Sequence, residues 1–99
     1  MSDPSPSLPG TLINQRDLSK LKWRCRRGLL ENDLFIARFF ERYEASLTVT
    51  QGLAMSALMT LSDNDLLDLH MGRKTLAQVG PEILSDEVSE VLKMLRRTH

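Results

Sequence analysis

The stretch that decides the fold runs from Arg24 to Tyr43 and reads R-C-R-R-G-L-L-E-N-D-L-F-I-A-R-F-F-E-R-Y. A glycine, Gly28, divides it into a basic part and a part in which apolar residues recur at helical spacing. Glycine readily adopts the left-handed conformation that closes a helix. The pattern therefore predicts two helices that meet at a tight corner, the first over Gln15 to Arg27 and the second from about residue 30 to Ser46 or Leu47.

Both predicted helices have an apolar face. In the first, Leu18, Leu21 and Cys25 share one side, so Cys25 is expected to be buried, and Trp23 is expected to be partly buried. The apolar face of the second helix is expected to comprise Leu30, Leu34, Phe35, Ile36, Phe39, Phe40 and Tyr43.

Three more helices are expected downstream. Thr48 and Gln51 form a capping box, and the helix that follows is predicted to bury Leu53, Leu58 and Leu61. Ser62 begins a fourth helix, which Gly72 ends. Residues 73–83 are expected to form a connector with room for one helical turn. Ser85 caps a last helix, whose apolar positions are Leu84, Val88, Val91, Leu92 and Leu95.

No stretch alternates with the period of a strand, so the fold class is all-α, a small single-domain bundle of about five helices. Residues 15–99 would form the bundle. Residues 1–14, rich in serine and proline at their start, are expected to form a disordered tail.

The composition excludes several function classes. Thirteen basic and thirteen acidic residues cancel, so no overall field attracts nucleic acid or anionic membrane. A single cysteine and the lack of a secretory signal predict a cytoplasmic protein, and no apolar run is long enough to insert in a membrane. No metal-ligand cluster, phosphate loop or catalytic pair stands out, and His70 is expected to be a surface residue or a partner of the helix dipole.

The corner at Gly28 has two explanations. Glu31 in the first turn of one helix and Arg27 at the end of another are what capping and helix dipoles favour. A cap does not require the crowding of like charges before the glycine, which suggests a surface for a partner. The crowded residues are Lys20, Lys22, Arg24, Arg26 and Arg27.

The motif Arg27-Gly28-x-x-Glu31, preceded by Trp23-Arg24-Cys25-Arg26 and followed by Asp33-Leu34 and Phe39-Phe40-Glu41, resembles the signature of the SdhE family. Members of this family are small succinate dehydrogenase assembly factors, also called FAD assembly factors. The resemblance is dense from Leu21 to Leu47 and continues more loosely to Gly72.

This resemblance implies a helical bundle that is not an enzyme and binds no cofactor stably. Its partner would be the flavoprotein subunit of succinate dehydrogenase or fumarate reductase, and it would promote covalent FAD attachment to a histidine of that subunit by positioning. The protein itself would be a monomer or weak dimer. Arg27, Gly28 and Glu31 would be the centre of the partner surface, flanked by Arg24, Arg26 and Asp33.

Two alternatives remain open. Some members of the family are described as antitoxin-like regulators, which makes a small regulatory interaction protein one alternative. The other is an RNA-binding module that uses the basic residues from Lys20 to Arg27. The segment from Tyr43 to Gly72 is acidic and contains no lysine or arginine, so it does not fit a DNA-binding helix-turn-helix.

Overall fold

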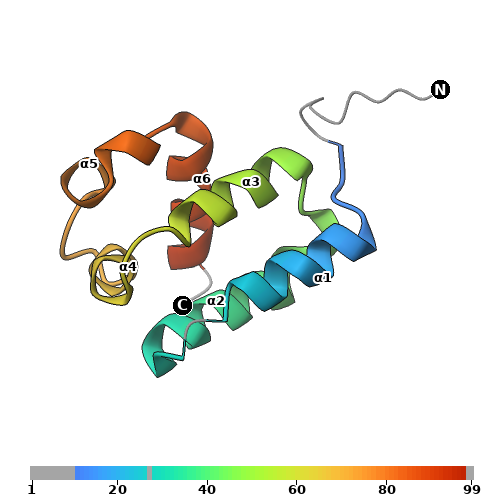
Figure 1. Ribbon diagram of the computed structural model, residues 1–99, viewed down its shortest axis with the longest axis horizontal. Helices are drawn as coiled ribbons and strands as arrows, with labels where there is room; N and C mark the ends of the chain where they lie inside the picture. Colours follow the sequence, from blue (N-terminus) through green and yellow to red (C-terminus); the bar gives the residue numbers. More distant parts are fainter. Residues whose placement is uncertain (1–10, 27, 98–99) are drawn as a thin grey trace.

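The computed structural model describes residues 11–26 and 28–97, and these residues form helices joined by short connections (Figure 1). In chain order the elements are α1 (Gln15–Arg24), α2 (Leu30–Tyr43), the 3-10 helix η1 (Glu44–Ser46), α3 (Val49–Leu58), α4 (Asp63–His70), α5 (Leu76–Val79), the 3-10 helix η2 (Pro81–Ile83) and α6 (Asp86–Arg97).

The helices surround one hydrophobic core, which confirms the predicted all-α fold. Figure 1 places α1 on one side and α5 on the opposite side, with α3 and α6 between them. The contact between α3 and α6 is the most extensive between two helices, and α2 packs on both α4 and α6. The largest side chains that are completely buried are Phe39, Leu47, Met55, Leu58, Leu66, Leu69 and Leu95.

The segment before α1 is attached to the start of α3. The Ile13 amide donates to the Leu47 carbonyl at 2.9 Å, and the Val49 amide donates to the Thr11 carbonyl at 2.8 Å. These bonds frame an isolated bridge between Leu12 and Thr48. Of the tail predicted over residues 1–14, the first ten lie outside the described residues, whereas residues 11–14 lead from this bridge into α1.

Side-chain caps begin the helices where the sequence predicts them. Thr48 and Gln51 form the complete capping box of α3, the Ser62 hydroxyl accepts from the Asp65 amide, and the Ser85 hydroxyl accepts from the Val88 amide. A second capping box, Thr75 with Gln78, begins α5 within the predicted connector. Each such cap contributes about 1 kcal/mol to helix stability.

The predicted ends of the first two helices are wrong by a few residues. α1 ends at Arg24 because the Arg26 amide turns back to the Trp23 carbonyl, at 3.2 Å, instead of continuing the helical ladder. α2 ends at Tyr43, and the chain tightens into η1 before Leu47. The link between α1 and α2 is therefore longer than a single closing glycine.

Several apolar side chains that were expected in the core are exposed. Trp23, predicted to be partly buried, is 72% exposed, and Leu53 and Leu84 are 68% and 50% exposed. Leu30 and Leu34 are exposed as well, because they lie about half a turn around α2 from Phe39, at 100° per residue. A 14-residue helix buries only one face, and Phe35, Ile36, Phe39 and Phe40 occupy it.

His70 is buried, contrary to the expectation of a surface or dipole role. Its side chain is 4% exposed and its ring lies 4.5 Å from that of Phe35, centroid to centroid. Neither ring nitrogen has a hydrogen-bond partner among the described residues. Burial lowers the pKa of His70 from 6.5 to about 4, and the nearby positive charge of Arg96 acts in the same direction.

We expect this buried histidine to make folding stability depend on pH in weak acid. Because the pKa is lower in the folded state, the unfolded chain binds the proton first, so stability is complete above about pH 6.5 and falls as the pH approaches 4. Urea unfolding should give a free energy on the order of 2 kcal/mol lower at pH 5 than at pH 7. In His70→Leu this difference should nearly vanish, and an equal loss in both proteins would contradict the assignment.

Candidate partner-binding site

The corner between α1 and α2 is held in a conformation that only glycine adopts without strain. Gly28 has a φ of +90°, in the left-handed region. Its amide donates to Oδ2 of Asp33 at 3.1 Å, a bond from the connecting link to the first turns of α2. A Cβ atom at Gly28 would meet no described atom within 4 Å beyond its chain neighbours, so the position opens onto free space.

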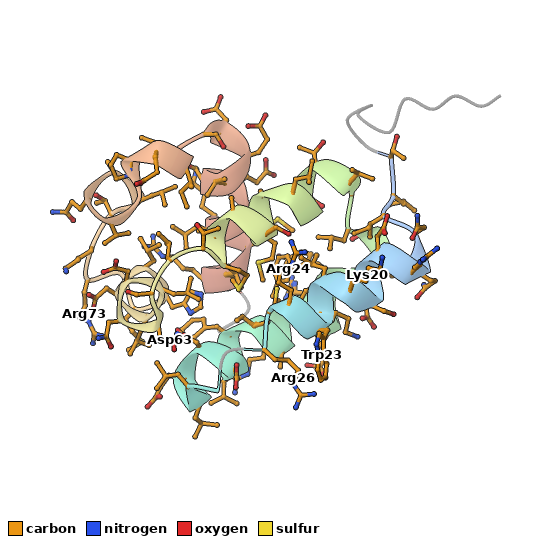
Figure 2. The ribbon with its side chains drawn as sticks, viewed as in Figure 1. Lys20, Trp23, Arg24, Arg26, Asp63 and Arg73 are labelled. Atoms are coloured by element: carbon orange, nitrogen blue, oxygen red, sulfur yellow. The ribbon has the colours of Figure 1, made fainter. Side chains whose placement is uncertain are left out.

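A buried side chain fixes the first turn of α2 against α4. Asn32 is fully buried, and its Nδ2 donates to the carbonyl of Asp63 at 3.0 Å. Figure 2 labels Asp63 at the end of α4 that lies near α2. The Oδ1 atom of Asn32 has no hydrogen-bond partner among the described residues. The residue that follows Glu31 is thus tied to the core, and it determines where Glu31 is presented.

A groove of about 770 Å³ extends along the junction of α1 and α2. Apolar side chains at its base include Ile36 and Phe40, and Trp23, Arg26 and Glu41 are exposed residues of its lining. The guanidinium carbon of Arg26 lies 5.2 Å from the centre of the Trp23 ring, a cation–π arrangement. Both side chains remain exposed, so this stack is presented to solvent beside the corner.

The basic residues of the sequence cluster are divided between two sides of α1. Figure 2 shows Trp23 and Arg26 on the side of α1 towards α2, and Lys20 and Arg24 on the side towards α3. Lys22 lies in the groove with Arg26 and forms an ion pair with Glu44 at 2.8 Å. The four described residues of the cluster therefore do not form one continuous basic patch of the kind that follows a phosphate backbone.

The structure brings together some of the predicted site residues and separates others. Arg26, Gly28 and Asp33 lie at the corner, Glu31 is exposed in the first turn of α2, and Arg24 lies on the other side of α1. Asp33 is half-buried and holds the corner through the Gly28 amide. Arg27 lies outside the described residues.

Three exposed apolar residues at the corner were not predicted as site residues. Trp23 lies near the end of α1, and Leu30 and Leu34 lie in the first half of α2; large exposed apolar side chains can mark protein interfaces. The sequence contained a signal for two of them, because Leu30 and Leu34 are out of phase with the Phe35 and Phe39 stripe. No comparable signal identified Trp23.

The metal-ligating and nucleophilic side chain types of the described residues are not gathered at the corner. Across residues 11–26 and 28–97 no group of three or more His, Cys, Asp or Glu side chains is placed to hold a metal ion. Both ring nitrogens of His70 are enclosed, and Cys25 is fully buried. Among the helices described, none is long and apolar enough to cross a membrane.

Comparison with known proteins gives a consistent set of similarities. Residues 19–99 match the family described as the flavinator of succinate dehydrogenase. The chain is 46% identical over 80 residues to the FAD assembly factor SdhE of Ralstonia nicotianae, covering 79% of each chain. It is 36% identical to that of Vibrio cholerae over 71% of this chain and 81% of the relative, and 33% identical to that of Coxiella burnetii over 79% and 83%. No solved structure matches the chain significantly.

We expect the left-handed conformation of Gly28 to have a measurable effect on stability. Gly28→Ala should lower the free energy of unfolding by about 1 to 2 kcal/mol through backbone strain alone, because the new methyl group meets no atom. Gly72→Ala is a matched control, since Gly72 also has a positive φ, +75°, and open space around it. Chemical denaturation should give a similar loss of unfolding free energy for Gly28→Ala and Gly72→Ala. A much larger loss for Gly28→Ala would contradict the open space around Gly28.

Proposed function

Because this chain belongs to the family of succinate dehydrogenase flavinators, we propose that it binds the flavoprotein subunit of succinate dehydrogenase through the corner between α1 and α2 and promotes covalent attachment of FAD to that subunit. Its relatives are named assembly factors, in agreement with a role that is not enzymatic.

The observation that carries this proposal is the exposed Trp23–Arg26 stack beside Gly28. Tryptophan and arginine are the residues most enriched among those that dominate binding energy at protein interfaces. Leu30 and Leu34 extend the apolar surface along α2, and Glu31 adds a charge in its first turn. The combination of an aromatic anchor, exposed leucines and a polar rim is typical of a protein-binding surface.

The corner is suited to positioning because its backbone is held from two directions. The Asp33 carboxylate holds the Gly28 amide, and Asn32 holds the start of α2 to α4. A surface that is rigid before binding loses little conformational entropy when the partner docks. Such a surface favours the partner conformation in which flavin and histidine meet, without supplying an acid or base itself.

We assign FAD to the partner and not to this chain. The groove between α1 and α2 is an open junction, and the sequence has no glycine-rich phosphate loop. The proposal also covers the flavoprotein of fumarate reductase as a second partner and places the protein in the cytoplasm. The single buried thiol, Cys25, is compatible with a reducing compartment.

The proposal is tested most directly by in-gel fluorescence of covalent flavin on the succinate dehydrogenase flavoprotein. Cells that lack this protein should have much weaker flavin fluorescence at equal flavoprotein level, and expression of the wild-type chain should restore it. Unchanged flavin attachment in the deletion strain would overturn the proposal.

We expect Gly28→Ala to fail in this complementation assay although it remains folded. Any side chain at Gly28 projects into the open space where the partner would approach. Gly72→Ala has similar backbone strain at the end of α4 and should restore flavin attachment. Equal failure of both variants would attribute the effect to stability rather than to contact.

Glu31 and Arg27 should behave as contact residues. We expect Glu31→Gln and Arg27→Ala to retain wild-type helical circular dichroism, because Glu31 is exposed and exposed charges contribute only about 0 to 1 kcal/mol to folding. Titration calorimetry with the apo flavoprotein should show at least about tenfold weaker binding, the usual consequence of losing one member of a charged pair in an interface. Glu90→Gln, an exposed carboxylate on α6, is the control, and wild-type affinity in the corner variants would contradict the assignment.

A further inference from the structure

A second exposed apolar feature lies on α3. Leu53 is 68% exposed, although the residues on both sides of it, Gly52 and Ala54, are buried. Gly52 is so close to α1 and its preceding segment that an added Cβ would lie 3.1 Å from Cδ1 of Ile13 and 3.6 Å from Cδ2 of Leu21. The small residues of α3 thus pack inward, and Leu53 points to solvent.

Leu53 lines two hollows, one on each side of it. One hollow, of about 260 Å³, lies between α1 and α3 and includes Lys20 and Arg24 in its lining. The other, of about 390 Å³, lies between α3 and the segment that leads into α6, and includes Glu82 and Glu87. Leu84, half exposed, follows Ile83 of the second hollow.

The two hollows carry opposite charge. Lys20 and Arg24 form no ion pair with another described residue, nor do Glu82 and Glu87. The one acidic side chain on the basic side, Asp17, accepts a hydrogen bond from Asn14 at 3.2 Å. The surface therefore consists of an exposed leucine with two cations on one side and two carboxylates on the other, none of which has an ion-pair partner within residues 11–26 and 28–97.

A surface of this kind is complementary to itself. In a two-fold interface, when residue i of one copy contacts residue j of the other, residue j of the first copy also contacts residue i of the second. A patch with positive charges on one side of a central apolar residue and negative charges on the other can therefore face a second copy so that opposite charges meet. We infer that the Leu53 face binds a second copy of this chain, with Leu53 near the two-fold axis and Lys20 and Arg24 of each copy opposite Glu82 and Glu87 of the other.

This association is weak. Stable dimers bury about 800 Å² or more on each partner, whereas this face offers two large exposed leucines and a charged rim. Trp23 and Arg26 lie on the other side of α1, so the inferred dimer leaves the groove between α1 and α2 open (Figure 2). The inference does not depend on the proposed function.

Sedimentation equilibrium of the full chain from about 10 µM to about 1 mM, at low salt, measures the association. Leu53→Asp should weaken it more than about tenfold, because the charge at the centre of the apolar contact would lose its water. Trp23→Asp is the matched control, since Trp23 is exposed to a similar extent in the other groove, and it should leave the association unchanged.

Charge reversal tests the two-fold arrangement itself. A Lys20→Glu/Arg24→Glu variant and a Glu82→Lys/Glu87→Lys variant should each remain monomeric. In each variant, like charges lie opposite each other in both halves of the two-fold interface. Mixed in equal amounts, the two should associate with an affinity within about twofold of wild type, since every cross-copy pair is again attractive. Circular dichroism checks that each variant is folded.

The outcomes that overturn the inference are distinct. A wild-type chain that stays monomeric up to about 1 mM excludes the dimer. Loss of association in Trp23→Asp but not in Leu53→Asp would move the interface to the other groove. Failure of the mixed charge-reversed variants to associate would exclude the two-fold arrangement.

Discussion

The structure depends on α2 serving two surfaces at once. One side of this helix supplies Phe35, Ile36, Phe39 and Phe40 to the core, and the opposite side carries Leu30 and Leu34 into solvent beside the corner. Because both sides belong to one rigid element, the packing of the core determines how the corner is presented. The buried amide of Asn32 strengthens this coupling, since it attaches the exposed first turn of α2 to the backbone of α4.

The geometry at Gly28 distinguishes the two explanations of the corner. A glycine that closes a helix lies directly after the capping residue. Here Cys25 caps α1, so Gly28 stands three positions beyond it, with its amide held by Asp33. The left-handed turn therefore belongs to the connecting link and not to the end of α1. Capping of α1 therefore does not account for the glycine, whereas the positive φ of the connecting link does.

The sequence predicted the features that are encoded locally. Thr48, Ser62 and Ser85 each precede a helix, and the side chain of each accepts a hydrogen bond from a backbone amide in its first turn, so these caps were recognised. The apolar stripe that contains Phe39 follows helical periodicity and was recognised as well. Leu53 was misassigned because α3 is apolar on most sides, and its packing face is marked by Gly52 and Ala54 rather than by its largest side chains. His70 was misassigned for another reason. Its burial results from Phe35 and α6, which are distant in sequence.

The candidate site was predictable only in part, because exposure is a tertiary property. Gly28 was identified from its residue type, but the division of the basic cluster follows from how α1 lies between α2 and α3. Tryptophan is a large apolar residue type that is often buried, and only the position of α1 leaves Trp23 exposed to solvent. Sequence periodicity assigns residues to faces, but it does not say which face a neighbouring helix covers.

The complete burial of Cys25 beneath the groove makes this thiol a reporter of motion. Cys25 is the only cysteine in the chain, and its exposed fraction is 0% at the junction of α1 and α2. A thiol reagent reaches it only when the packing around it opens, so the rate of labelling in the native protein reports the free energy of that opening. One natural side chain thus records how often the protein opens around the end of α1, without any probe being introduced.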